Sequence, residues 1–363
     1  MSHTRRTFLS TAGMATAGVL LSGNIYSADT ERPKIKIGQI GTGHAHADKI
    51  ATLRKLTDCF EVVGIAEDDL ELRKAAEKKS AYKDLRWMSS DELLAYPGLQ
   101  AVAVETVETV CLPVALRCIR AGKHIHLDKP AGTSLTDFRQ VLDEAEAKKL
   151  TVQMGYMLRT NPAIQFCLKA VKDGLLGNIF DIDAAMSRHD DESARKRVGK
   201  FSGGSLFLLG CHLIDLAILL RGEPKKIHPF LKQTRSDGCV DNSMVVFEYP
   251  NGCFATLRAA ITEVEGPQRR HLTVHGDKGT IVIQPLEEKG NMGGTLKLAL
   301  EKETDGYKKG YQTITLTPLK DRYEDQWREL AAMICGARVN PYSYRHEFTV
   351  QKCLLEACGI PTQ

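Results

Sequence analysis

The chain has 363 residues, of which 43% are apolar and 26% are charged, and its formal net charge is +4. This length favours two domains, and the nearly balanced charge argues against nucleic acid or an anionic membrane surface as the partner. The ten cysteines form no CxxC pair and many lie within apolar segments, so we expect mostly free thiols.

Residues 1–28 have the order of a twin-arginine signal peptide. Arg5 and Arg6 precede the weakly apolar run "TAGMATAGVLLSG", and small residues around Ser27 and Ala28 suit a signal peptidase. The run is short and diluted by Thr, Gly and Ser, so it predicts no stable membrane anchor. We expect the twin-arginine (Tat) machinery to export the folded protein to a bacterial periplasm. The alternative is an untargeted N-terminus that contains two arginines by chance.

Residues 33–155 alternate between β-rich and helical patterns. The segment "KIKIGQIGTGHAHADKIATLRKL" combines a strand, a glycine turn and apolar residues at helical spacing from Ile50 onwards. The runs "FEVVGIAEDD", "AVAVET", "HIHLDKP" and "LTVQMGY" supply further strands, and Ser89 with Glu92 is typical of a capping box that begins a helix. This alternation predicts an α/β Rossmann domain with a parallel sheet covered on both faces.

The glycine turn has part of a nucleotide-binding signature. Gly41 and Gly43 match the first two glycines of GxGxxG, where a missing side chain permits a tight turn and the close approach of a pyrophosphate. Glu67 ends the second strand, where a carboxylate accepts hydrogen bonds from a ribose diol and repels a 2′-phosphate. We therefore expect NAD, with NADP less favoured. His46 replaces the third glycine and either loosens helix packing or presents its imidazole to cofactor or substrate.

Two HxH pairs raise the question of a metal site. His44 and His46 lie in the glycine turn, and His124 and His126 share one face of a strand. Catalytic zinc needs three protein ligands, and no third ligand stands at an informative spacing. We therefore expect no metal, and structural or phosphate-contacting roles for these histidines.

Three further motifs carry a family resemblance. The stretches "AGKHIHLDKPAG" (121–132), "VQMGYMLRTNP" (152–162) and "SGGSLFLLGCHLIDLAILLRG" (202–222) resemble the glucose-fructose oxidoreductase, inositol dehydrogenase and rhizopine-catabolism (Gfo/Idh/MocA) family. Family members usually read Glu-Lys-Pro where this chain has Asp128, Lys129 and Pro130. The resemblance implies an N-terminal Rossmann domain, a C-terminal α+β domain with an open, mainly antiparallel sheet, an active site between them, and packing into homodimers or homotetramers. Asp128 and Pro130 join the expected cofactor-binding residues.

Residues 156–363 support the second domain independently. Asn251 and Gly252 separate two β-rich arms, which predicts a hairpin. The runs "HLTVHGDKGTIVIQP" and "GYQTITLTP" continue as strands, and residues 323–339 predict a closing amphipathic helix. We expect this domain to bind substrate and to form the oligomer.

Lys129 and His212 are the expected catalytic residues. Hydride transfer to or from a sugar carbon also moves a proton at the adjacent oxygen, which requires a positioned acid or base. Lys129 follows a strand end, where open α/β sheets bind ligands, and partial burial would lower its pKa; the alternative is a solvated loop lysine. His212 and Asp215 share a helix face and either point into the crevice or form a satisfied core pair. The resemblance implies an acid/base or substrate-binding role for His212.

The remaining polar candidates are substrate ligands. They are Tyr156, which could stack on a pyranose ring, with Arg159, Arg188, His189 and Asp190. Family members commonly have an acidic residue four positions before the motif histidine, and here that residue is Leu208. Either Lys129 and His212 suffice, other groups orient the substrate, or ordinary dehydrogenation has been lost.

The combined features predict an NAD-dependent oxidoreductase that acts on a sugar, sugar derivative or polyol. A periplasm offers no pool of NAD, so an exported enzyme would hold its cofactor tightly and regenerate it in place. One alternative is a redox-neutral glycosidase or lyase, in which a transient keto-sugar acidifies the neighbouring C–H. A second alternative is a non-catalytic sugar-binding protein on the same fold.

Overall fold

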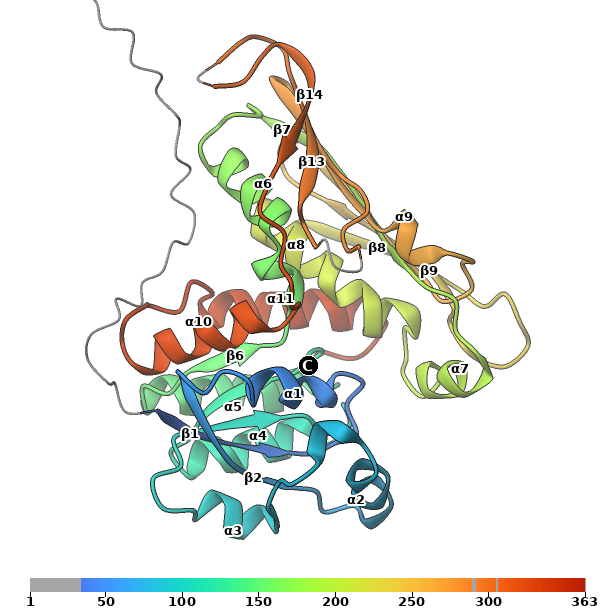
Figure 1. The fold of residues 1–363 in the computed structure, drawn as a ribbon. Coiled ribbons are helices and arrows are strands. Elements are labelled where there is room, and N and C mark those ends of the chain that lie inside the picture. The colour runs from blue at the N-terminus through green and yellow to red at the C-terminus, as the bar shows by residue number, and fades with distance from the viewer. Residues whose placement is uncertain (1–33, 289–291, 305, 363) are drawn as a thin grey trace, which may run out of the picture.

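A computed structural model describes residues 34–288, 292–304 and 306–362, and the predicted signal peptide lies outside these residues. The described chain forms two stacked domains (Figure 1). A six-stranded sheet forms the N-terminal domain and an eight-stranded sheet the C-terminal domain. The predicted fold class is confirmed.

All strand pairs of the N-terminal sheet are parallel, in the order β3-β2-β1-β4-β5-β6. Strand order reverses between β1 and β4, and ligands bind at the carboxyl ends of strands beside such a reversal. The strands are β1 (Ile35–Ile40), β2 (Phe60–Ala66), β3 (Trp87–Met88), β4 (Ala101–Val104), β5 (His124–Leu127) and β6 (Val152–Met154). The helices are η1 (Ala47–Lys49), α1 (Ile50–Leu53), α2 (Leu70–Glu77), η2 (Ser80–Tyr82), α3 (Ser90–Leu94), α4 (Cys111–Arg120) and α5 (Leu135–Ala147).

Local sequence explains several of these boundaries. The Ser89 hydroxyl accepts a hydrogen bond from the Glu92 backbone N–H (3.2 Å), and the Glu92 carboxylate accepts one from the Ser89 N–H (2.7 Å). This is the predicted capping box, and it begins α3. Every residue of β4, "AVAV", is buried because helices cover both faces of a parallel sheet.

The C-terminal sheet has the order β14-β13-β12-β11-β7-β10-β9-β8, and only its β7–β10 pair is parallel. The hairpin predicted at Asn251 and Gly252 joins β9 to β10. The strands are β7 (Ile179–Ser187), β8 (Lys226–Lys232), β9 (Asn242–Glu248), β10 (Phe254–Ala260), β11 (His271–Gly276), β12 (Gly279–Ile283), β13 (Thr295–Leu300) and β14 (Gly310–Thr315). The helices are η3 (Met157–Thr160), α6 (Pro162–Lys172), α7 (Glu192–Val198), the π-helical η4 (Leu206–Gly210), α8 (Cys211–Arg221) and α9 (Gly266–Arg269).

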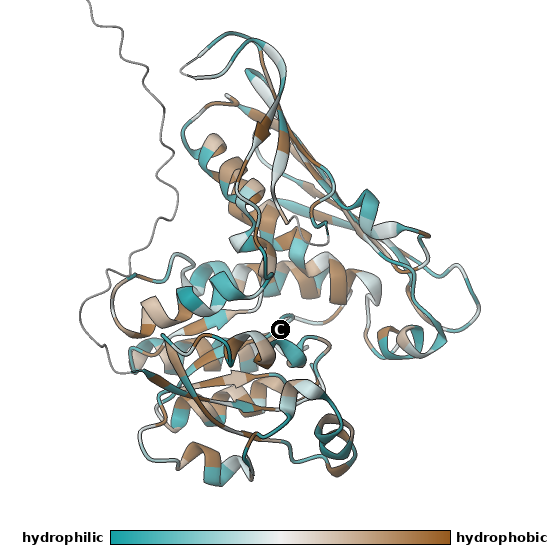
Figure 2. Cartoon of the chain, viewed as in Figure 1, coloured by the Kyte–Doolittle hydropathy of each residue, from teal (hydrophilic) through white to brown (hydrophobic). Residues whose placement is uncertain are grey.

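The last two helices return towards the N-terminal domain. The predicted closing helix forms as α10 (Glu324–Ile334), and its Trp327 packs edge-on against Phe60 of β2 and shares a buried apolar cluster with Ile37 and Ala103 of the first sheet. A further helix that the sequence analysis did not predict, α11 (Tyr344–Ala357), follows and packs against α5 and α8. Residues assigned to the C-terminal domain by sequence therefore complete the packing of the N-terminal domain. Figure 1 shows α10 beside the N-terminal sheet. Figure 2 shows the apolar residues of α8 in the interior, between the C-terminal sheet and the N-terminal domain.

The cysteine prediction is confirmed. None of the ten cysteines forms a disulfide, and only Cys335 is exposed. Burial raises the pKa of Cys211 and Cys167 to about 12, so both remain neutral thiols within the core. Among the described residues, no helix has the length and apolarity that crossing a bilayer requires.

Candidate active site

The turn after β1 fits the pyrophosphate of a dinucleotide. Gly41 has a φ of +96°, and a Cβ atom there would lie 2.5 Å from the backbone nitrogen of Thr106, so the position requires glycine. A Cβ on Gly43 would lie 2.7 Å from a valine side chain. Glu67 accepts hydrogen bonds from the backbone N–H (2.7 Å) and the hydroxyl (2.9 Å) of Thr42. A carboxylate thus stands beside the glycine turn, where these folds hold a ribose.

A buried ionic cluster lies at the carboxyl ends of β4 and β5. The Lys49 Nζ atom is 2.8 Å from Glu105 Oε1, 2.7 Å from Asp128 Oδ2 and 2.7 Å from His126 Nε2. Burial lowers the pKa of Lys49, but Asp128 and Glu105 outweigh it and raise that pKa. Burial raises the pKa of Glu105 well above its usual value, although Lys49 opposes this shift. Burial and then Lys49 lower the pKa of His126 to about 3.

Asp128 links this cluster to the first HxH pair. Its Oδ2 atom lies 3.0 Å from His44 Nδ1 and 3.5 Å from His46 Nδ1. Burial raises the pKa of Asp128, but His44, Lys49 and His46 overcome that effect and hold it well below its usual value. Burial, followed by repulsion from Lys129, lowers the pKa of His46 to about 3, so its imidazole is neutral at pH 7.

The fold supplies a potential third metal ligand that sequence spacing did not indicate. Asp128 lies close enough to complete a triad with His44 and His46, and also one with Glu105 and His126. The Lys49 ammonium is 2.7 Å from the shared Asp128 oxygen and opposes a cation there by charge repulsion. The absence of metal stays a prediction. His124 is separate from both triads, and its Nδ1 accepts a hydrogen bond from the Thr151 backbone N–H.

The loop after β5 presents Lys129 to the interdomain space. Lys129 is buried, and its Nζ atom donates a hydrogen bond to the Leu208 backbone carbonyl (3.3 Å). The Lys129–Pro130 peptide is cis. Gln351 of α11 holds the following residues, because its side chain accepts from the Ala131 N–H (3.2 Å) and donates to the Gly132 carbonyl (2.7 Å). The predicted catalytic lysine therefore stands on a fixed loop.

His212 faces Lys129 from the opposite domain. The π-helical turn that contains Leu208 leads into α8, and His212 lies in the first turn of that helix. π-Helical segments are frequent at functional sites. Burial, followed by repulsion from Lys129, lowers the pKa of His212 well below its usual value, so the ring is neutral at pH 7. The His212 side chain is 1% exposed and its Nδ1 atom has no hydrogen-bond partner among the described residues.

A cavity of about 110 Å³ joins these groups. Ligand pockets commonly have roughly 300 to 1,000 Å³, so this one has room for only a small substrate or part of one. The sequence-predicted residues that line it are His44, His46, Lys129, Arg188 and His212, together with Leu208. Sequence reasoning missed four charged lining residues, which are Glu108, Arg197, Arg270 and Arg322. Arg270 directly precedes β11, and its place at a strand end is the one sequence feature that could have indicated a site residue.

Asp215, Arg159, Tyr156 and His189 are among the predicted site residues that lie outside this lining. Asp215 does not share the crevice with His212, because Arg159 binds both its oxygens (2.7 and 2.9 Å). Arg159 also binds Glu347 of α11 (2.6 Å), so it forms part of a buried network instead of facing the cavity. Tyr156 is 2% exposed and packs edge-on against the His212 ring, which leaves no open face for a sugar. His189 is exposed and pairs in a β-bridge with Thr262.

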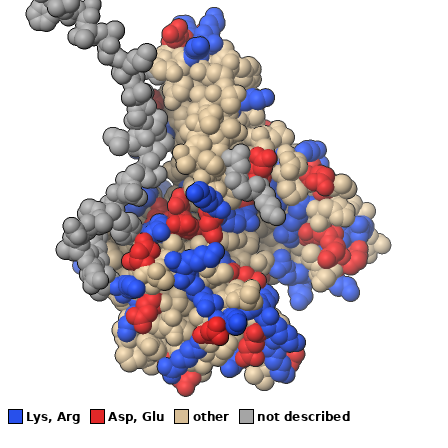
Figure 3. Space-filling view, in the orientation of Figure 1, with Lys and Arg blue, Asp and Glu red and all other residues tan. Residues whose placement is uncertain are grey.

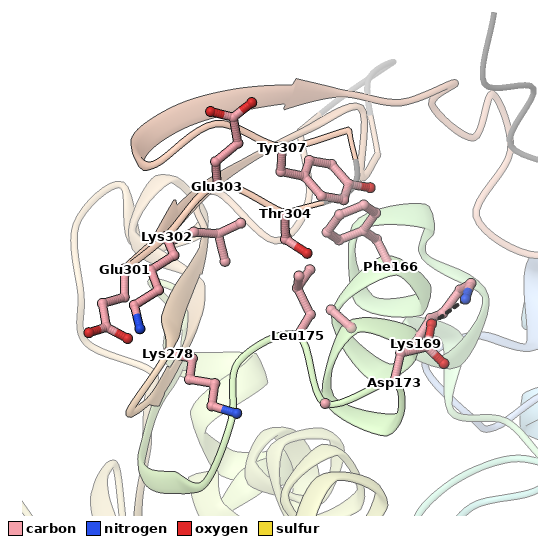
Figure 4. Close-up of a pocket in the computed structure, with 13 residues that line it drawn as sticks. Phe166, Lys169, Asp173, Leu175, Lys278, Glu301, Lys302, Glu303, Thr304 and Tyr307 are labelled. Atoms are coloured by element: carbon pink, nitrogen blue, oxygen red, sulfur yellow. Dashed lines mark hydrogen bonds and ion pairs between the residues drawn. The ribbon is translucent and has the colours of Figure 1, made fainter. Parts of the chain in front are cut away.

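A larger hollow of about 680 Å³ lies at the far end of the C-terminal domain. Figure 4 shows that its lining includes Phe166 and Lys169 of α6 and Thr304 and Tyr307 between β13 and β14. Lys169 forms an ion pair with Asp173 at its rim. None of the residues predicted for cofactor or catalysis lines it, so the smaller interdomain cavity is the candidate active site.

The chain matches family models in both domains. Residues 35–156 match the model described as "Oxidoreductase family, NAD-binding Rossmann fold", and residues 164–282 match the GFO/IDH/MocA C-terminal domain. The myo-inositol 2-dehydrogenase of Thermotoga maritima is 24% identical over 297 residues, which are 75% of this chain and 83% of that relative. The trans-1,2-dihydrobenzene-1,2-diol dehydrogenase of Bos taurus is 24% identical over 248 residues, 68% and 72% of the two chains.

A solved structure agrees with the architecture. The UDP-N-acetylglucosamine 3-dehydrogenase from Acidithiobacillus ferrooxidans has a TM-score of 0.73 and 20% sequence identity, and the match covers 91% of this chain and 98% of the other. Its likeness shows a shared two-domain fold. With family models matched in both domains and the glycine turn, Lys129 loop and His212 helix in place, the chain belongs to the Gfo/Idh/MocA family of NAD(P)-binding oxidoreductases.

Proposed function

We propose that this protein is an NAD-dependent oxidoreductase that acts on a CH–OH carbon of a sugar, sugar derivative or polyol. One observation carries the proposal: Lys129 and His212, from different domains, line the same cavity. The dinucleotide-compatible turn at Gly41 belongs to the same crevice of the parallel sheet. The names of the inositol and dihydrodiol dehydrogenases among the relatives support a cyclic CH–OH substrate.

The two catalytic residues provide the proton chemistry. Nicotinamide, when bound, supplies or accepts the hydride. Oxidation of a hydroxyl also releases a proton from its oxygen, and a group beside that oxygen must take it. Lys129 lies in the cavity and has no carboxylate partner in the described part of the chain, so its amino group can exchange this proton. His212 is neutral at pH 7, and its unpartnered Nδ1 atom can hydrogen-bond to the same oxygen.

Leu208 limits which other groups can take part. Its side chain lines the cavity, but it can neither accept a proton nor bind a hydroxyl. Its backbone carbonyl instead accepts the hydrogen bond from Lys129 and keeps the amine in place until a substrate oxygen arrives. Lys129 and His212 are therefore sufficient for acid–base catalysis under this proposal.

The cofactor and its compartment form a second part of the proposal. We propose that NAD is preferred over NADP because the Glu67 carboxylate beside the turn repels a 2′-phosphate. We also propose tight retention of the cofactor and twin-arginine export to the periplasm, supported by the order of residues 1–28. Purification from a periplasmic fraction, denaturation and assay of the released NAD(H) should give close to one equivalent per chain. An empty, cytoplasmic protein would contradict this part.

An activity assay tests the reaction itself. The NAD-loaded chain is incubated with a panel of sugars and polyols, and cofactor reduction is followed by absorbance, with Lys129→Met as the inactive comparison. Solvent deuterium incorporation next to an oxidised carbon, together with glycoside cleavage, would instead indicate the redox-neutral elimination cycle. Sugar binding that survives in Lys129→Met, with no turnover in either protein, would indicate a non-catalytic binder.

We propose assembly into a homodimer or homotetramer through the open face of the C-terminal sheet. Phe230 of β8 and Phe254 of β10 point to the same face and are each 48% exposed. Exposed aromatic side chains on a sheet face are typical of a protein interface. Light scattering of the wild type and Phe254→Glu should show a smaller assembly for the variant, and a monomeric wild type would contradict the proposal.

A further inference from the structure

Four arginines line the candidate active site in addition to Lys129. Arg188 follows β7, Arg197 lies on α7, Arg270 precedes β11 and Arg322 precedes α10. They come from segments far apart in the chain, so their convergence is a property of the fold. In Figure 3, Lys and Arg side chains border the hollow between the two domains.

Nearby carboxylates balance only part of this charge. Arg188 forms an ion pair with Asp190 (2.6 Å). Arg270 and Arg322 contact the same carboxylate, that of Glu287, with Arg270 at 2.5 Å. One anion therefore serves two guanidinium groups.

Among the residues that the structure describes, the other two cations have no acidic partner. The Arg197 side chain forms no ion pair or hydrogen bond with any residue that the structure describes, and its Nε atom is buried. Lys129 donates to an uncharged carbonyl, that of Leu208. Glu108 is the one acidic residue among those that line the cavity. Counting Glu108 with Asp190 and Glu287, three carboxylates face five cations, and two positive charges remain unbalanced.

We propose that the substrate carries an anionic group, a carboxylate or a phosphate, which these pocket arginines bind. This inference rests on the proposed function and specifies its substrate class. Guanidinium groups bind both oxyanions through paired, charge-assisted hydrogen bonds. An unbalanced cationic cavity is unfavourable when empty and becomes favourable when an anion enters. A neutral sugar or polyol would leave the two positive charges without compensation.

The cofactor pyrophosphate does not account for the arginines. Gly41, Gly43 and Glu67, which fit the pyrophosphate and ribose of a dinucleotide, do not line this cavity, and of the same turn only His44, Ala45 and His46 reach it. The arginines belong to the C-terminal domain and to the segment that leads into α10, and they surround Lys129 and His212. The anion they bind is therefore attached to the molecule that reacts at those two residues.

The test compares matched ligands on the NAD-loaded full chain. Calorimetry measures the binding of glucose, glucuronate and glucose 6-phosphate, and of the galactose, galacturonate and galactose 6-phosphate set; myo-inositol and inorganic phosphate complete the panel. Arg197→Gln removes a charge without leaving a carboxylate unpaired, and Arg197→Lys retains the charge. Arg235→Gln is the control, because Arg235 is exposed, pairs with Glu192 at the start of α7 and does not line the cavity.

At least one anionic member should bind roughly tenfold or more tightly than its neutral counterpart, and tighter binding of the uronate or the 6-phosphate identifies which oxyanion is preferred. Arg197→Gln should weaken anion binding by roughly ten- to a hundredfold, Arg197→Lys should recover part of it, and Arg235→Gln should change it little. If Arg197→Gln does not fold, the wild-type comparison still decides.

The inference is wrong if no anion binds more tightly than its neutral counterpart, including the case in which nothing binds. It is also wrong if Arg197→Gln and Arg235→Gln have the same effect on anion affinity. Hydride transfer with neutral sugars alone would overturn this inference and leave the proposed oxidoreductase intact. Selective anion binding without any hydride transfer would support this inference and overturn the proposed oxidoreductase.

Discussion

Replacing Lys49 by methionine should destabilise the protein by about 3 kcal/mol. Methionine keeps an unbranched apolar stem but removes the ammonium, which lies 2.7 Å from Asp128 Oδ2 and 2.8 Å from Glu105 Oε1. Both carboxylates are buried and lose their contact with the Lys49 ammonium. Removing one partner of a buried ion pair costs roughly 3–5 kcal/mol, because the remaining charge is left uncompensated.

Protonation places the expected loss at the lower end of that range. Burial raises the pKa of Glu105 well above its usual value even with Lys49 nearby, so this carboxyl becomes neutral once the ammonium is gone. Asp128 keeps its contact with His44 (3.0 Å). A carboxyl whose pKa is higher in the folded than in the unfolded state binds its proton more readily when folded. The difference in the free energy of unfolding between Lys49→Met and wild type should therefore shrink as pH falls.

Denaturant unfolding at neutral and at mildly acidic pH measures both effects. Lys79→Met is the matched control, because the Lys79–Asp48 ion pair (3.0 Å) is about half exposed and should contribute no more than about 1 kcal/mol. Adding Glu105→Gln to Lys49→Met should restore part of the lost stability. Equal losses of unfolding free energy for Lys49→Met and Lys79→Met would refute the view that a charged, buried cluster supports the candidate active site.

Three further predictions concern catalysis, cofactor binding and pH. Lys129→Ala should lower kcat by roughly a hundredfold or more while NAD affinity, measured by fluorescence titration, changes little; unchanged kcat would rule out the assigned role. Gly41→Ala should abolish NAD binding, because a Cβ there meets backbone at 2.5 Å, whereas Gly122→Ala, also at positive φ but with nothing within 4 Å, should bind NAD normally. The folded-state pKa values of His46 and His126, both lowered to about 3, mean that the unfolded chain binds more protons below about pH 6.5. Stability should therefore fall as pH drops from 6.5 towards 3, and denaturant midpoints that rise over this interval would contradict the assignment.

The parts of the fold that sequence predicted depend on short-range patterns. The apolar run of β4, the Ser89 capping box and the turn at Asn251 each follow from a few neighbouring residues. Gly41 was also predictable, since a strand, a glycine turn and a helix occur in direct succession. The family motifs predicted that Lys129 and His212 belong to one site, although neither motif alone indicates where its residue lies relative to the other.

The parts that sequence did not predict depend on contacts between distant residues. Lys49 meets Asp128 across 79 positions and Arg159 meets Glu347 across 188, and such pairs leave no periodic signal. Helical spacing alone grouped Asp215 with His212, because the competing guanidinium of Arg159 belongs to another element. Arg197, Arg270 and Arg322 were missed for the same reason, since each one resembles an ordinary surface charge in its own segment.

The contact between Gln351 and the loop at Ala131 and Gly132 has a consequence for biosynthesis. The loop that contains Lys129 is translated more than two hundred residues before the glutamine that secures it, as the separations of 219 and 220 positions show. A nascent chain can therefore assemble its first sheet early, yet the loop of Lys129, the proposed catalytic residue, lacks its final support until α11 leaves the ribosome. Catalytic competence should consequently appear as one of the last events in the maturation of the polypeptide.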